Sequence, residues 1–142
     1  MILADTSGLL ALFNRREPAH PAVAAVLQEE PGPIVVSPYV IAELDYLAAT
    51  RLGVSDELAI LAELAGGAYL LPQFSADNLS TAIKIIERYG DQQVGLTDAS
   101  LVVLADHYRT KSVLTLDRRH FEVLRPLSGG RFRILPSNSH IG

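Results

Sequence analysis

Four acidic residues stand where the chain leaves an apolar run or enters the helical segment after one. Asp5 follows the first apolar run of the chain, and Asp117 follows the fourth. Asp98 begins a segment with helical apolar periodicity, and Glu43 lies between one and two turns into the helix expected after the second run. Open parallel sheets bind ligands beyond the carboxyl ends of their strands. We therefore expect the four carboxylates to face one cleft.

Four carboxylates in one cleft require protonation or a cation. Two carboxylates about 4 Å apart repel each other by roughly 4 kcal/mol at an effective dielectric constant of about 20. A site made of carboxylate oxygens suits Mg²⁺ or Mn²⁺, which also take water and substrate phosphate as ligands. The chain contains no Cys, and its four His residues are not at metal-ligand spacing. The acids therefore predict a Mg²⁺ site, with Mn²⁺ as a second suitable metal.

Each acid also has a structural explanation. An Asp at a helix start is a favoured N-cap, worth about 0.5–2 kcal/mol. Other capping residues are available, however, because Thr6 lies beside Asp5 and Thr97 lies beside Asp98. Capping does not explain Glu43, which stands among apolar residues inside a helix and could alone be a solvated side chain. The four positions together favour the metal site.

The chain lacks the motifs of other α/β folds that use acidic residues. The P-loop sequence G-x-x-x-x-G-K-[ST] is absent, and so is the nucleophile elbow G-x-S-x-G. A haloacid-dehalogenase site needs a second Asp two residues after the first, where this chain has Ser7. A receiver domain needs an acidic pair after the first strand, and Asp5 stands alone there. These alternatives are excluded.

The acids need a parallel sheet to bring them together, and the apolar pattern predicts one. Strands are expected at residues 2–4, 34–36, 68–71, 112–116 and 132–135. Helices are expected over residues 6–13, 19–29, 38–52, 55–65, 75–89, 96–108 and 118–124. Continuous apolar runs are typical of strands covered on both faces. We predict an α/β fold with a mainly parallel five-stranded sheet.

Length and composition indicate one domain. The chain has 142 residues, of which 49% are hydrophobic, and domains of about 100–150 residues are the commonest. No apolar stretch reaches the roughly 18 residues of a membrane span. The first five residues lack the positive region of a secretory signal. We expect a single domain over residues 1–142, with residues 136–142 as a frayed tail, in the cytoplasm and away from membranes.

The charge is distributed unevenly along the chain. The net charge of −4 taken alone disfavours a nucleic-acid partner. Residues 1–105 hold thirteen acidic and five basic residues, whereas residues 106–142 hold three acidic and seven basic ones. A basic C-terminal quarter therefore follows an acidic body.

Four short segments contain the acids and the polar residues beside them: Asp5–Ser7, Ser37–Leu44, Gly95–Ala99 and Thr115–Phe121. In this order they resemble the motifs of the PIN-domain family, and more narrowly those of its VapC-type ribonuclease toxins. Each motif is weak alone, but their order and spacing together are specific, and the resemblance extends from Leu3 to about Leu135. It implies a three-layer α/β/α PIN-like fold.

The resemblance maps the family's acidic quartet onto this chain without substitution. Asp5 and Asp98 would be metal ligands. Glu43 and Asp117 would ligate through water, complete a second metal position or orient the attacking water. The hydroxyls that the family places beside its acids would be Thr6, Thr97 and Thr115. The activity implied is that of a Mg²⁺-dependent endoribonuclease toxin, cutting tRNA or rRNA to a 5′-phosphate and a 3′-hydroxyl.

Partners and alternatives follow from the same resemblance. It implies neutralisation by a cognate VapB-type antitoxin, a homodimer and a toxin–antitoxin hetero-oligomer. A PIN-like domain that binds RNA or protein without cutting is the alternative, against which the intact quartet argues, and a deoxyribonuclease stays open. Candidates for an antitoxin groove are Leu9, Leu10, Phe13, Leu44, Tyr46 and Leu47.

Basic side chains near the acids are candidate RNA contacts. Arg118 and Arg119 directly follow the last acid of the quartet, so we expect them at the rim of the cleft. Guanidinium groups there could bind the phosphates that flank the scissile bond. Arg15 and Arg16, at the end of the first helix, are predicted to approach the same rim. His120 is a weaker candidate for RNA contact.

Overall fold

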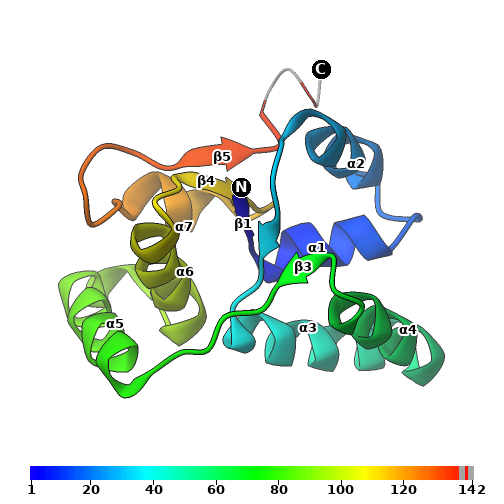
Figure 1. Cartoon of the computed structure of the whole chain (residues 1–142), viewed down its shortest axis with the longest axis horizontal. Coiled ribbons are helices and arrows are strands. Elements are labelled where there is room, and N and C mark those ends of the chain that lie inside the picture. Colours follow the sequence, from blue (N-terminus) through cyan, green and yellow to red (C-terminus); the bar gives the residue numbers. More distant parts are fainter. Residues whose placement is uncertain (138–139, 141–142) are drawn as a thin grey trace.

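A single parallel sheet runs through the molecule (Figure 1). The computed structural model describes residues 1–137 and His140. The strand order is β3-β2-β1-β4-β5, and every neighbouring pair is parallel. The prediction of a mainly parallel five-stranded sheet is thus confirmed. The strands are β1 (Ile2–Ala4), β2 (Ile34–Val35), β3 (Tyr69–Leu70), β4 (Ser112–Leu114) and β5 (Arg133–Leu135).

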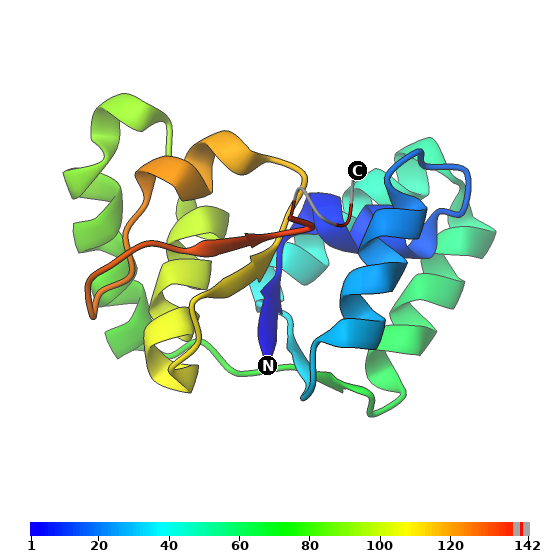
Figure 2. The ribbon, with the colours of Figure 1, turned by 90° about the horizontal axis from the view of Figure 1, so that it is seen from above.

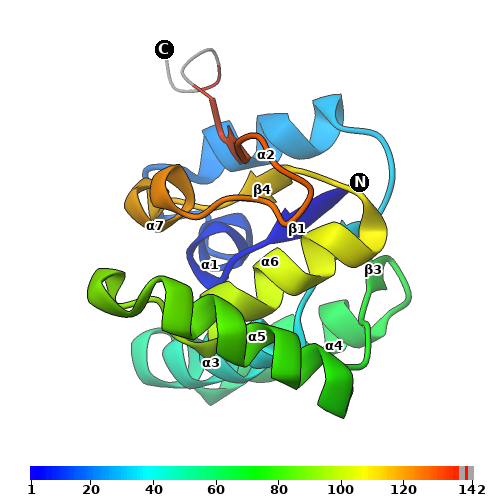
Figure 3. The same cartoon turned by 90° about the vertical axis from the view of Figure 1, so that its left-hand side faces the viewer.

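Helices cover both faces of the sheet. Figure 3 shows α2 on one side and α3, α5 and α6 on the other, which confirms the three-layer α/β/α arrangement. The α-helices are α1 (Thr6–Phe13), α2 (His20–Glu29), α3 (Pro38–Arg51), α4 (Val54–Ala65), α5 (Ala76–Arg88), α6 (Leu96–Tyr108) and α7 (Arg118–Val123). A short 3₁₀ helix, η1 (Gly90–Gln92), precedes α6.

The central strand β1 is buried on both faces. Its three residues are 0–2% exposed, as a continuous apolar run in a covered parallel sheet requires. Leu3 is in register with Val35 of β2 and with Val113 of β4. The chain therefore leaves the middle of the sheet at Asp5, with neighbouring strands ending on either side.

A glycine allows α1 to pack closely against the end of β4. A Cβ built on Gly8 would lie 2.6 Å from the carbonyl oxygen of Leu114. The same oxygen accepts a hydrogen bond from the Asp5 N–H at 2.9 Å. Only a residue without a side chain fits this approach, which holds the start of α1 against β4.

Two buried serines join the helices that carry the remaining acids. Ser37 caps α3 by accepting from the Tyr39 N–H, and the helix begins at Pro38, the first residue of the predicted range 38–52. The Ser37 hydroxyl also lies 2.7 Å from the hydroxyl of Ser100 on α6. Both side chains are fully buried. This contact ties the N-terminal halves of α3 and α6 together.

The fourth strand ends earlier than the predicted residue 116. β4 stops at Leu114; the Thr115 N–H still donates to the carbonyl of Leu135 at 2.9 Å, but the next two N–H groups bond to side chains. The Leu116 N–H donates to the Ser7 hydroxyl at 2.9 Å, and the Asp117 N–H donates to the Thr115 hydroxyl at 3.0 Å. The residues after β4 form a loop anchored to α1.

Other boundaries differ by one or two residues. The helix predicted to begin at Ser55 begins at Val54, after Gly53, whose φ of +101° favours glycine. The predicted frayed tail includes residues 138–139 and 141–142, which lie outside the described residues. Within the described part of the tail, His140 is 2.6 Å from the carboxylate of Glu29.

The two halves of the sequence lie on either side of β1. Figure 2 shows α5, α6 and α7 on one side of this strand, and α2 and α4 on the other. Asp5 and Glu43 come from the first half of the chain and Asp98 and Asp117 from the second, so a site that includes all four lies between the halves. Across the described residues, every helix is too short or too polar to cross a membrane.

Candidate active site

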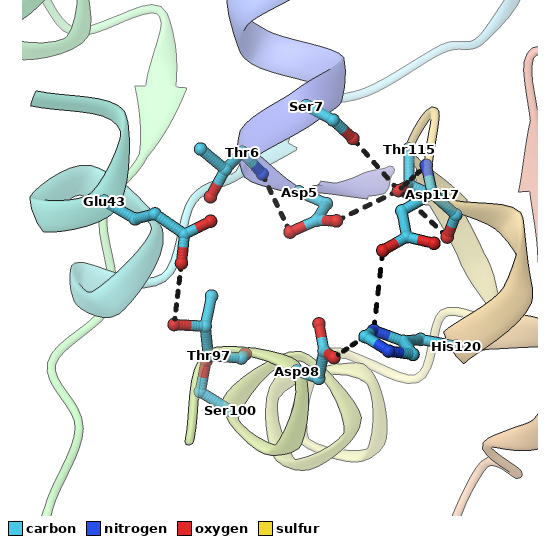
Figure 4. A network of polar contacts seen from close by, with 10 residues as sticks. All are labelled: Asp5, Thr6, Ser7, Glu43, Thr97, Asp98, Ser100, Thr115, Asp117 and His120. Carbon is cyan, nitrogen blue, oxygen red and sulfur yellow. Dashed lines mark hydrogen bonds and ion pairs between the residues drawn. The ribbon is translucent and has the colours of Figure 1, made fainter. Parts of the chain in front are cut away.

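All four predicted acids line one cavity of about 430 Å³. Asp5 follows β1, Glu43 lies on α3, Asp98 on α6, and Asp117 immediately before α7. Figure 4 shows their side chains pointing toward one another from these separate segments. The cavity is further lined by Thr6, Ser7, Leu10, Ala11, Glu17, Leu47, Arg51, Gly95, Leu96, Thr97, Leu116 and His120.

Asp5 is the most constrained of the acids. The Thr6 N–H donates to its Oδ1 at 2.8 Å, and the Thr115 hydroxyl donates to its Oδ2 at 2.9 Å. The side chain thereby caps α1, so Asp5 has the structural role of an N-cap as well as a place in the cavity. Each oxygen of an ionised carboxylate has two lone pairs. Asp5 therefore keeps acceptor capacity toward the cavity while both its oxygens are held in place.

Burial and neighbouring negative charges make Asp5 a weak acid. Its residue exposure is 7%, and burial is the main reason that its pKa rises from 3.8 to about 6. The charges of Asp98 and Glu43 raise the pKa further, whereas the two hydrogen bonds lower it. A cation in the cavity would relieve the repulsion and favour the ionised form.

Asp98 faces the cavity from the first turn of α6. Burial raises its pKa above the ordinary value, with contributions from Asp117 and Glu43, while His120 acts in the opposite direction. The His120 Nδ1 lies 2.7 Å from Asp98 Oδ2 and 3.6 Å from Asp117 Oδ2. His120 thus contacts two of the four acids at once.

The hydroxyls predicted beside the acids occupy three different positions. Thr115 bridges Asp5 and the backbone before α7, as described above. The Thr97 hydroxyl lies 3.5 Å from Glu43 Oε2, at the limit of a hydrogen bond between α6 and α3. The Thr6 hydroxyl oxygen is buried without a hydrogen-bond partner among the described residues.

This donor set fits a hydrated divalent cation. Within residues 1–137 and His140, no three Asp, Glu or His side chains are close enough to hold a metal ion directly. Mg²⁺ keeps several waters and is usually bound by one or two carboxylates. The unpartnered Thr6 hydroxyl, the repulsion at Asp5 and the carboxylate oxygens all suit such an ion and its waters.

The predicted basic rim is only partly formed. The Arg118 guanidinium donates to the carbonyl of Pro136 at 3.0 Å and lies 3.7 Å from Glu122, so it turns away from the acids. Arg119 lines a neighbouring cavity, which shares His120 with the acidic one. Of the two arginines, only Arg119 lies next to the site.

Arg15 and Arg16 do not share the acidic cavity, contrary to the prediction. They line another cavity of about 600 Å³, together with Phe13 and Tyr69. Helix α1 ends at Phe13 and the chain turns away before the arginines. The two arginines therefore line a different cavity from the four acids, although Glu17, the next residue along the chain, lines the acidic one.

The six apolar residues expected to form an antitoxin groove are also separated. Leu9 and Leu44 are fully buried in the core, whereas Tyr46 is 66% exposed. Leu10 and Leu47 line the acidic cavity, and Phe13 lines the cavity of the two arginines. One continuous groove of these six residues is not formed, because they lie on different faces of α1 and α3.

Sequence reasoning missed Arg51 as a cavity residue, and it predicted His120 only as a weak RNA contact and not as a neighbour of the acids. His120 lies three residues after Asp117 on a helix, and positions three apart on a helix are neighbours. Arg51 follows Glu43 by eight residues, with Leu47 midway, so all three share one face of α3. Both of these basic side chains line the cavity with the acids.

Comparisons with known proteins agree with the fold. The PIN domain family model matches residues 2–125. Ribonuclease VapC26 of Mycobacterium tuberculosis is 54% identical over 135 residues, covering 95% of this chain and 100% of that protein.

Two solved structures show the same fold. Mycobacterium tuberculosis VapC20, described as a Sarcin-Ricin loop cleaving toxin, has a TM-score of 0.76 at 20% identity, over 82% of this chain and 90% of its own. A toxin–antitoxin complex from Klebsiella pneumoniae has a TM-score of 0.65 at 20% identity, over 87% and 92%. With the family match and the VapC26 relative, they lead to one conclusion: this chain is a PIN-domain protein of the VapC type.

Proposed function

We propose that this protein is a Mg²⁺-dependent endoribonuclease toxin that hydrolyses phosphodiester bonds of tRNA or rRNA. The observation that carries the proposal is the cavity where the four predicted carboxylates meet from four separate segments. Such a cavity is suited to a metal ion and, through the metal, to a phosphate. The ribonuclease name of the VapC26 relative supports RNA as the substrate class.

Asp5 and Asp98 would hold the metal ion, since they are the more buried acids. Glu43 and Asp117 would bind its waters or orient the attacking water. Bound Mg²⁺ would lower the pKa of its water and neutralise negative charge on the phosphate, and Mn²⁺ would serve similarly. The unpartnered hydroxyl of Thr6 is available to one of these waters.

The protein's own side chains supply positioning and electrostatics. The hydrogen bonds from Thr115 and the Thr6 N–H fix the Asp5 carboxylate before substrate arrives, which avoids reorganisation during the reaction. With no Cys in the chain, a thiolate nucleophile is excluded. Water attack would leave a 5′-phosphate and a 3′-hydroxyl.

A cognate VapB-type antitoxin is the proposed partner. Support comes from the structural likeness to the Klebsiella pneumoniae toxin–antitoxin complex. We expect a homodimer that enters a toxin–antitoxin hetero-oligomer, acting in the cytoplasm where its RNA substrate is found. Expression of the chain with and without a protein encoded beside it would test neutralisation.

Substitution of the two buried acids tests the proposed activity. Asp5→Asn and Asp98→Ala should each lower Mg²⁺-dependent RNA cleavage by about a hundredfold or more, because each weakens the binding of the metal that would stabilise charge on the phosphate. Asp106→Asn, at an exposed position on α6, is the matched control and should cleave normally. The cleaved bonds would be identified by sequencing RNA 5′ ends after controlled expression.

Full cleavage by a folded Asp5 or Asp98 variant would contradict the metal-site assignment. RNA binding without cleavage by the native chain, in Mg²⁺ and in Mn²⁺, would favour a catalytically silent PIN-like domain instead. Circular dichroism of each variant would establish that it folds.

A further inference from the structure

One arginine, Arg51, lines the same cavity as the four predicted acids. Arg51 lies in the last turn of α3 and is exposed, and its side chain lines the cavity. Among the described residues it makes no ion pair within 4 Å, although Glu17 and Glu43 line the same cavity. Its guanidinium therefore keeps its donors available to a ligand.

The position of Arg51 follows from the periodicity of α3. Glu43, Leu47 and Arg51 are spaced four residues apart and face the cavity together. A rise of 1.5 Å per residue separates the backbones of Glu43 and Arg51 by about 12 Å. The cavity thus has an acidic end, where Asp5 and Asp98 lie, and a second end that carries a guanidinium.

The two ends suit two different phosphates of one chain. Carboxylates bind a phosphate only through a cation, whereas a guanidinium binds it directly with paired N–H donors. A metal ion between Asp5 and Asp98 would hold the scissile phosphate. Arg51, about two turns of α3 beyond Glu43, is placed for a phosphate farther along the strand.

We propose that Arg51 forms a subsite for an RNA backbone phosphate that flanks the scissile bond. The inference rests on the proposed function, since it takes RNA as the substrate. The subsite contacts a phosphate and not a base, so it adds affinity and register without selecting sequence. Arg51 is a positioning residue, and the acids remain the groups at the reacting phosphate.

Binding to a non-cleaved RNA tests the subsite directly. The probe is a short fluorescein-labelled single-stranded RNA of mixed sequence, titrated in Mg²⁺ by fluorescence anisotropy with the Asp98→Ala protein. Adding Arg51→Ala should weaken binding about tenfold. The slope of log affinity against log salt should also decrease by about 0.7, the value for one single-strand phosphate contact.

A matched control separates this effect from the loss of a helix-end charge. Arg88 occupies the last turn of α5, as Arg51 does in α3, and does not line the acidic cavity. Arg88→Ala should leave both the affinity and the salt slope unchanged. Arg51→Lys should restore part of the affinity, because a lysine keeps the charge but loses the paired geometry.

Cleavage kinetics give a second measurement on the otherwise native chain. Arg51→Ala should raise KM about tenfold and change kcat by less than about twofold, as expected when binding is lost equally from substrate and transition state. Unchanged affinity and salt slope in Arg51→Ala would overturn the subsite alone. Failure of the native chain to bind or cleave RNA would instead overturn the proposed function.

Discussion

At the scale of single residues, the site is built around one constrained carboxylate. Asp5 ends the central strand, caps the first helix and receives hydrogen bonds on both oxygens. Its burial between Asp98 and Glu43 raises its pKa to about 6. The protein thus carries a destabilising charge at neutral pH unless a cation is bound. Strongly shifted pKa values of this kind are common at functional sites.

This charge predicts a pH dependence of stability in metal-free protein. An acid with a raised pKa in the folded state binds protons more tightly there than in the unfolded chain, so the free energy of unfolding falls as pH rises. For Asp5 the fall occurs between about pH 4 and pH 6. Its full size is roughly 3 kcal/mol, at 1.4 kcal/mol per pKa unit.

Asp5→Asn should remove that dependence. The amide keeps an oxygen to accept from the Thr6 N–H but carries no charge. Urea unfolding in EDTA at pH 7 should show the variant to be about 1–3 kcal/mol more stable than the native chain, with a flatter pH profile. Asp106→Asn, at an exposed position, should change neither. A variant less stable than the native chain at pH 7 would show that the Asp5 carboxylate is not strained by its surroundings.

At the scale of elements, the site depends on how closely α1 approaches β4. The loop after β4 is tied to α1 through Ser7 and Thr115, whose hydroxyls lie 3.2 Å apart. Gly8 permits this contact because it has no Cβ to meet Leu114. The same packing brings Asp5 and Asp117 to one cavity, so helix placement and site geometry are coupled.

Gly8→Ala should therefore destabilise the protein, although helix propensity alone favours alanine by about 1 kcal/mol. Forcing a methyl group into a packed contact costs about 1–3 kcal/mol. Gly90→Ala is the control, because a Cβ there meets nothing within 4 Å. Denaturant unfolding of both variants should show a loss of stability only at Gly8. Equal stability of Gly8→Ala and the native chain would mean that α1 can shift freely from β4.

At the scale of the whole molecule, a cation is expected to join the two halves of the chain. Asp5 and Glu43 come from the first half and Asp98 and Asp117 from the second, and β1 lies between them. A ligand that binds only the folded state stabilises it by mass action. The metal would therefore act on the stability of the whole domain as well as on the reaction.

Removal of divalent metal tests this expectation. Mg²⁺ at about a hundred times its Kd should stabilise the native chain by about 3 kcal/mol, which corresponds to a rise in Tm of roughly 10 °C. EDTA should reverse the rise, as differential scanning fluorimetry would show. Asp98→Ala should show a much smaller rise, and an equal rise in that variant would place the metal elsewhere.

The net negative charge of the chain is also compatible with an RNA substrate at this scale. The net charge of −4 includes five acids that share one cavity, the four predicted ones and Glu17, where a bound cation would offset their charge. Acidic composition therefore does not by itself argue against RNA. Salt dependence of RNA affinity reports instead on the few phosphates that basic side chains contact.

The sequence alone determined the parallel sheet and the place of each acid relative to it. Continuous apolar runs and strong local signals, such as Ser37 followed by Pro38, act over a few residues and can be recognised without the fold. Parallel strands end at a common edge, so acids placed after them converge whatever the details of packing. For this reason Asp5 and Asp117 were predicted at one cleft, and the structure places them there.

Only the tertiary structure decided which basic side chains reach that cleft. Arg15 and Arg16 are close in sequence to Asp5, yet they follow the end of α1 and line another cavity. Arg51 is distant in sequence and reaches the acids along the face of α3, while His120 does so from the turn of α7. Helix direction and length, set by packing against the sheet, determine where a long side chain lies, and neither is encoded within a few residues.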